Sequence, residues 1–103
     1  MESFNNDWKT RVYNFGDVKE GSKNIEYTFE YEGEKEYKDH SSSCGCTTGK
    51  WGDNKIKVIY VLGKVPEHVK REKGYMDIIK KVFINFKDGH QDELRLTGRI
   101  YPA

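Results

Sequence analysis

The sequence has few prolines, few cysteines and no long apolar run. Two prolines and two cysteines occur in 103 residues, so neither a proline-rich linker nor a framework of disulfide bonds is expected. No segment approaches the roughly 18 apolar residues that a membrane span needs. The first residues, MESFNND, lack the basic and then apolar layout of a signal peptide. The sequence therefore predicts a protein that stays inside the cell that makes it.

The chain also lacks an excess of charge of one sign. Lysine and arginine total 18 and aspartate and glutamate 17, a formal net charge of +1. This balance gives no reason to expect nucleic acid or an anionic membrane as a partner. The distribution is uneven, because residues 1–40 have a net charge of −4 and residues 50–81 one of +5. The asymmetry either orients a partner or a second copy, or reflects ordinary solvated strand faces.

Aromatic residues are what the sequence has in quantity. Seven tyrosines, five phenylalanines and two tryptophans supply large apolar groups, several with polar tips. The length is that of one domain, and no repeat or internal linker divides it. We therefore expect a single domain over residues 1–103, with residues 1–9 as a possible N-terminal arm.

Alternation of apolar and polar residues with a period of two is the main structural signal. It recurs in residues 25–31, 78–86 and 94–100, and residues 55–62 are rich in β-branched and aromatic side chains. Residues 11–15 form a shorter candidate strand. Such patterns are typical of strands with one or both faces buried.

The segments between these strands read mostly as turns. Asp88-Gly89 predicts a hairpin between residues 78–86 and the last strand. Residues 34–43 are the weakest strand candidate, because Tyr37 is their one apolar residue. Residues 63–77 are expected to be a long surface connection that holds one or two helical turns with Pro66 at the first position. The resulting prediction is an all-β, immunoglobulin-like sandwich of about seven antiparallel strands with Greek-key connections.

Three short motifs occur in a characteristic order. Residues 15–21 read FGDVKEG, residues 43–48 read SCGCTT and residues 94–100 read LRLTGRI. In this order the motifs resemble the bacterial DUF1573 family, whose domains are related to the immunoglobulin-like ASH and hydin-type modules, and the match spans roughly residues 11–101. The resemblance implies an immunoglobulin-like domain without an assigned enzymatic activity, in a family of which many members look exported.

The Cys44-Gly45-Cys46 motif is the main candidate for chemistry. Two thiolates and a histidine, with His40 as the nearest, can begin a tetrahedral metal site, but no second cysteine pair completes it. A turn in which Gly45 supplies conformational freedom and one cysteine packs as a small apolar group explains the motif more simply. A disulfide between Cys44 and Cys46 would close a very small ring, so both are expected as thiols in a reducing cytoplasm.

The aromatic residues Trp8, Trp51 and Tyr101 are the predicted interaction residues, since Trp and Tyr are enriched at interface hot spots. No catalytic residue, cofactor or small-molecule substrate is expected. The function predicted is a structural or interaction module, most concretely an accessory protein on the capsid, neck or tail of a bacteriophage virion assembled in the host cytoplasm. Capsid or other virion proteins are then its partners, in many copies per particle. The alternatives are an adhesion or scaffold module of the bacterial envelope or periplasm, and a metal or redox protein that uses Cys44 and Cys46.

Overall fold

The structure, a computed structural model, describes residues 7–43 and 45–103. Over these residues it has seven strands and one short helix. The elements are β1 (Val12–Lys19), β2 (Ile25–Glu30), β3 (Tyr37–Ser42), β4 (Thr47–Gly52), β5 (Lys55–Tyr60), α1 (Glu67–Glu72), β6 (Met76–Phe86) and β7 (Gln91–Tyr101). The predicted all-β class is confirmed.

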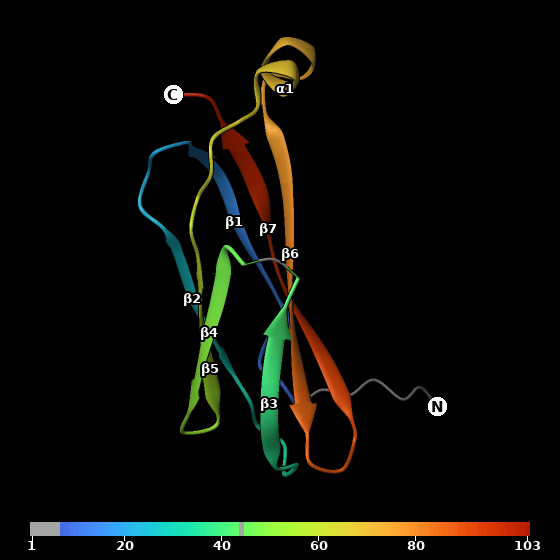
Figure 1. Cartoon of the computed structure of the whole chain (residues 1–103). Coiled ribbons are helices and arrows are strands. Elements are labelled where there is room, and N and C mark those ends of the chain that lie inside the picture. The colour runs from blue at the N-terminus through green and yellow to red at the C-terminus, as the bar shows by residue number, and fades with distance from the viewer. Residues whose placement is uncertain (1–6, 44) are drawn as a thin grey trace, which may run out of the picture.

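The strands form two sheets that pack face to face (Figure 1). One sheet has the order β1-β7-β6-β3 and the other the order β2-β5-β4. The chain changes sheet after β1, β2, β3 and β5, which is the Greek-key connectivity of an immunoglobulin-like sandwich. The structure therefore agrees with the predicted fold in architecture and in strand number.

β1 departs from the expected antiparallel pairing, because it runs parallel to β7. The two strands come from opposite ends of the sequence, so no short turn fixes their relative direction. Their register shifts between Asn14 and Asp17, where the Asn14 side-chain oxygen accepts the backbone N–H of Gly16 at 2.8 Å. Gly16 has a φ of +78°, a conformation that few residues other than glycine adopt. The result is a bulge in the edge strand.

β6 and β7 form the hairpin that Asp88-Gly89 predicts. The backbone N–H of Phe86 donates to the carbonyl of His90 at 2.9 Å, and Gly89 takes the positive φ, +92°, that the turn needs. Each strand has 11 residues, which makes them the longest described strands. This hairpin sets the length of the molecule, whose largest dimension is 47 Å.

β4 was not predicted from the sequence pattern. It pairs with β5 through a two-residue turn in which both Asp53 and Asn54 have positive φ, +51° and +58°. This is the geometry of a type I′ turn, which Asp and Asn tolerate better than most residues. A Cβ added to Gly49 of β4 would lie 2.9 Å from Ile56 and 3.2 Å from His40, so a larger residue would not fit there without movement.

The core lies between the sheets and is formed by the side chains on the inner face of each. Its large fully buried side chains are Phe29, Ile56, Val58, Val82, Ile84, Phe86, Leu94, Leu96 and Ile100. Gly98 of β7 lies against the ring of Phe15 of β1, which a Cβ at position 98 would overlap. The opening and closing motifs singled out in the sequence are therefore in contact.

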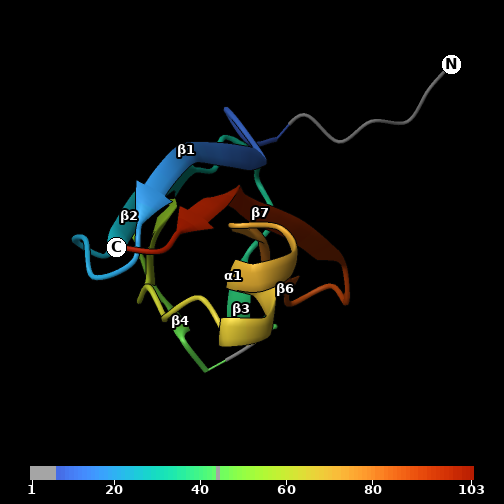
Figure 2. The same ribbon diagram turned by 90° about the horizontal axis from the view of Figure 1, so that it is seen from above.

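Residues 63–77 contain the predicted helical turns, as α1, which covers one end of the sandwich (Figure 2). Pro66 lies just before the first helical residue rather than at it. Glu20 holds this end together by accepting the backbone N–H of Val65 at 2.7 Å and of Ala103 at 3.3 Å. These hydrogen bonds hold the pKa of Glu20 below its ordinary value of 4.5. In the described part of the chain, no helix is long and apolar enough to span a membrane.

The expected N-terminal arm is shorter than residues 1–9. Residues 1–6 lie outside the described residues, but the backbone N–H of Lys9 donates to the carbonyl of Glu30 at 3.0 Å. Trp8 pairs with Tyr31 as an isolated antiparallel bridge. From residue 7 onwards the chain is thus attached to the end of β2.

Candidate protein-docking face

A shallow groove lies on the outer face of the four-stranded sheet, at the bulge in β1. Two rows of side chains cross three strands there, as the strand registers show. One row is Ile79, Thr97 and Asn14, and the other is Asp77, Arg99 and Asp17. We call these six residues the docking face. They line a shallow groove of about 540 Å³.

Ile79 is the apolar centre of the docking face. Its side chain is 59% exposed, and Val12, on the same outer face in β1, is 50% exposed. Removing the exposed part of such a side chain from water favours association. The face therefore offers apolar area to a partner, with the polar side chains of Thr97 and Asn14 beside it.

Charged side chains border the apolar centre. The Arg99 Nε lies 3.2 Å from Asp77 Oδ1, and the Lys73 Nζ lies 3.0 Å from Asp77 Oδ2. The hydrogen bond from Lys73 is the main cause that lowers the pKa of Asp77. The Arg99 guanidinium also lies over the Tyr75 ring, 4.6 Å from its centroid. The described residues place no ion-pair partner against Asp17, which leaves its carboxylate able to receive a donor from a partner.

Trp8 is not the exposed contact residue that the sequence suggested. Its side chain is 5% exposed, its Nε1 donates to Asp92 Oδ2 at 2.8 Å, and its ring centroid is 4.9 Å from that of Tyr31. Asp92 is itself buried and also lies 2.7 Å from His90 Nε2 and 3.5 Å from Arg11. An indole has a large apolar body and one donor, so a core that supplies one buried acceptor holds it well.

Trp51 and Tyr101 are partly exposed, and their role as interaction residues stays a prediction. Trp51 stacks on Tyr37 with ring centroids 4.4 Å apart and an interplanar angle of 2°. It borders two further shallow grooves, of about 310 and 480 Å³. Tyr101 packs near Tyr75 at 5.5 Å, at the other end of the molecule, so the predicted aromatic residues do not form one surface.

The cysteine motif lies at the connection between β3 and β4. Gly45 and Cys46 lie in a turn, and Cys46 packs partly buried against the core, as the turn interpretation predicts. Cys46 is disulfide-bonded, whereas thiols were expected. Cys44, the other cysteine of the chain, lies outside the described residues.

His40, the proposed third metal ligand, has a different partner. Its Nδ1 lies 2.6 Å from the hydroxyl of Tyr37, and its other nitrogen faces Gly49 across the space between β3 and β4. Over the described residues, no group of three or more His, Cys, Asp or Glu side chains is placed to hold a metal ion. His40 therefore lies between β3 and β4, the edge strands of the two sheets, and hydrogen-bonds within β3.

The docking face was not identified from the sequence. The one local signal is that Ile79 follows Ile78, which breaks the alternation of β6 and places an apolar residue on the polar face. No family model matches this chain, and a search of the curated proteins finds no match to it. The resemblance to the DUF1573 family therefore stays a prediction.

Proposed function

We propose that this chain is a non-catalytic structural module that binds other proteins, specifically an accessory protein that decorates the capsid, neck or tail of a bacteriophage particle. The observation that carries the proposal is the docking face, where Ile79 is 59% exposed in a groove and Val12, on the same outer face, is 50% exposed. Protein interfaces commonly have an apolar centre and a polar rim, and the docking face has this arrangement on a small scale.

The groove favours a repeated and individually modest contact. It is shallow, and its residues come from the rigid strands β1, β6 and β7 rather than from loops. A rigid face loses little conformational freedom on binding. Many equivalent sites on one particle raise the overall avidity of such contacts without requiring a deep pocket.

The test is to lyse cells that produce the particles, separate the lysate on a density gradient, and follow the chain by mass spectrometry. We expect the chain to travel with a major capsid protein and to remain there at moderate salt. Recovery in the soluble or envelope fractions alone would contradict the virion assignment.

A matched pair of variants connects this result to the docking face. Ile79→Asp places a charge in the groove, whereas Val61→Asp makes the same kind of change at a side chain that is 50% exposed outside the face. We expect Ile79→Asp to lower the apparent association constant for the particle at least about tenfold, which corresponds to 1.4 kcal/mol, and Val61→Asp to bind as the wild type does. Equal losses would remove the docking face from the proposal.

One observation favours the second candidate, an adhesion or scaffold module of the bacterial envelope. Cys46 is disulfide-bonded, and disulfides persist in oxidising compartments such as the periplasm. Alkylation of intact cells with a maleimide, followed by mass spectrometry of the chain, tests this candidate. Unmodified cysteines in chain recovered from the envelope fraction would support it, and full labelling of chain from the soluble fraction would contradict it.

A further inference from the structure

The end of the molecule that α1 covers has an excess of positive charge. This helix end consists of residues 19–23, 61–75 and 101–103, which come together around Glu20 and α1 (Figure 1). It contains six basic and three acidic residues, a formal net charge of +3. Part of the positively charged segment 50–81 therefore lies at this end of the structure.

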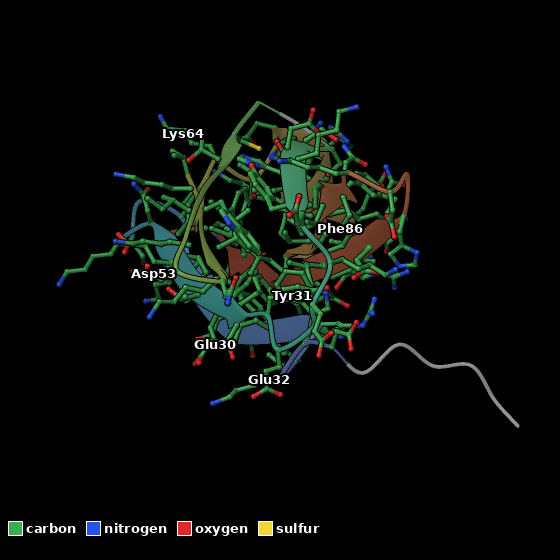
Figure 3. All side chains as sticks on the ribbon, turned by 90° about the horizontal axis from the view of Figure 1, so that it is seen from below. Glu30, Tyr31, Glu32, Asp53, Lys64 and Phe86 are labelled. Carbon is green, nitrogen blue, oxygen red and sulfur yellow. The ribbon has the colours of Figure 1, made fainter. Side chains whose placement is uncertain are left out.

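The opposite end has the opposite charge. This hairpin end consists of residues 7–9, 30–39, 53–55 and 87–90, at the turns β4–β5 and β6–β7 and the connection β2–β3 (Figure 1). It contains eight acidic and five basic residues, a formal net charge of −3. Figure 3 shows this end, with Glu30, Glu32 and Asp53 around the aromatic centre of Tyr31 and Phe86.

Ion pairs inside the helix end do not neutralise its positive charge. Lys70 lies 3.8 Å from Glu20 and 3.4 Å from Glu67, and Lys73 pairs with Asp77 outside this end. Among the described residues, no ion pair forms at four other cations of the helix end: Lys19, Lys23, Lys64 and Arg71. Among the acids of the helix end, Glu72 likewise forms no ion pair with a described residue.

The hairpin end keeps an excess of carboxylates in the same way. Three ion pairs form there, Lys9 with Glu30, Lys35 with Asp88, and Lys87 with Glu36. Of the five acids outside these three pairs, four form no ion pair within the described residues: Glu32, Glu34, Asp39 and Asp53. Two cations of this end, Lys38 and Lys55, form none there either. Each end thus presents charges that its own side chains do not neutralise.

We propose that two copies of this chain associate head to tail, with the helix end of one copy against the hairpin end of the next. The formal net charges of the two ends are equal in size and opposite in sign, so a head-to-tail contact brings opposite charges together. Contacts between two helix ends or two hairpin ends bring like charges together and are repulsive. The contact joins two different surfaces of the chain, so it leaves a free end on every copy and permits rows of copies. The proposal goes beyond the proposed function and does not depend on it.

The shape of the molecule limits the strength of this contact. The cross-section normal to the 47 Å axis is 31 × 19 Å, so one end can bury about 600 Å² per copy at most, which is the low end of specific interfaces. The side chains are exposed, and their attraction is screened over about 8 Å at physiological salt but over about 30 Å at 10 mM. Association is therefore expected to be weak and to depend strongly on salt.

The experiment is sedimentation velocity on the full chain over a series of concentrations at 10 mM and at 150 mM salt. We expect a sedimentation coefficient that rises with concentration at 10 mM salt, and an association constant at least about tenfold lower at 150 mM. A chain that stays monomeric at millimolar concentration and 10 mM salt would overturn the proposal.

Two charge-reversal variants test the geometry. Lys64→Glu with Arg71→Glu makes the helix end negative, and Glu32→Lys with Glu34→Lys makes the hairpin end positive. We expect each double variant to be monomeric alone, and a mixture of the two to associate again, because every contact between them then joins opposite charges. A mixture that stays monomeric, with both variants folded as judged by circular dichroism, contradicts the head-to-tail arrangement.

A third variant controls for net charge. Lys50→Glu with Lys81→Glu makes the same charge change as the helix-end variant, but in β4 and β6, between the two ends. It is expected to associate as the wild type does. If it loses association to the same degree as the helix-end variant, net charge rather than the two ends controls association and the proposal is wrong.

Discussion

The two ends of the sandwich are closed in different ways. The hairpin end is filled with aromatic rings, in which Tyr31 lies 4.9 Å from Trp8 and 5.1 Å from Phe86 between ring centroids. The helix end is covered by α1, none of whose residues is buried, and it is held by hydrogen bonds to the carboxylate of Glu20. Burial of aromatic rings therefore dominates at the hairpin end, whereas the helix end combines burial of Val65, which is 3% exposed, with polar contacts at Glu20.

The two kinds of contact make the stability of the two ends sensitive to different changes. Apolar burial does not depend on protonation, so the aromatic rings of the hairpin end should respond mainly to loss of side-chain volume. A carboxylate that accepts backbone N–H groups does depend on its protonation state, so the helix end should respond to pH. Substitutions at each end can separate the two mechanisms.

The largest effect is expected from Trp8→Ala. The change removes a side chain that is 5% exposed and should lower the free energy of unfolding by about 3–5 kcal/mol. Val69→Ala in α1, where the side chain is only partly buried, should lower it by about 1 kcal/mol. Urea unfolding followed by far-ultraviolet circular dichroism measures both. Equal losses would mean that the two ends contribute alike.

The position of Trp8 also marks the limit of what the sequence predicts. Local alternation was sufficient for β2, β6 and β7, β-branched and aromatic content for β5, and Asp88-Gly89 for the β6–β7 hairpin. These signals all arise between near neighbours in the chain. The partner of Trp8 is Asp92, 84 residues away. No local pattern encodes a contact between residues so far apart in the sequence, so Trp8 was expected in an N-terminal arm.

β4 and the docking face show two other limits. β4 carries Gly49 where a side chain would collide with His40 and Ile56, so the strand lacks the apolar alternation that reveals its neighbours. The adjacent residues Ile78 and Ile79 do show in the sequence that β6 has an apolar residue on each face. Only the arrangement of the sheets decides that the first is buried and the second exposed.

A smaller effect at the hairpin end is expected from the acceptor that holds the indole. Asp92→Ala removes the carboxylate that faces Trp8, His90 and Arg11, and leaving these donors without it should lower the free energy of unfolding by about 1–3 kcal/mol. Asp92→Asn keeps one oxygen acceptor, so it should lose less. Urea unfolding of both variants at pH 7 compares them, and a greater loss in Asp92→Asn would show that the indole does not depend on this acceptor.

The smallest effect, and the one that most sharpens the comparison, is expected from Glu20→Gln at the helix end. The folded pKa of Glu20 lies below 4.5 because the N–H groups of Val65 and Ala103 favour the charged form. The stability that Glu20 provides is thus fully present above its unfolded pKa and is lost as the pH falls through the lower folded pKa. Wild type should be more stable than Glu20→Gln at neutral pH, and the difference should shrink below about pH 4.5.

Urea unfolding between pH 7 and pH 2 follows this difference directly. Glu72→Gln removes one negative charge from the exposed face of α1 and controls for net charge at the same end. Phe86→Leu provides the contrast at the other end, since Phe86 is 1% exposed and its side chain has no polar atom, so its deficit should change little over the same pH range. A Glu20→Gln deficit that stays constant with pH would show that Glu20 acts through its shape rather than its charge, and the two ends would then differ in composition but not in mechanism.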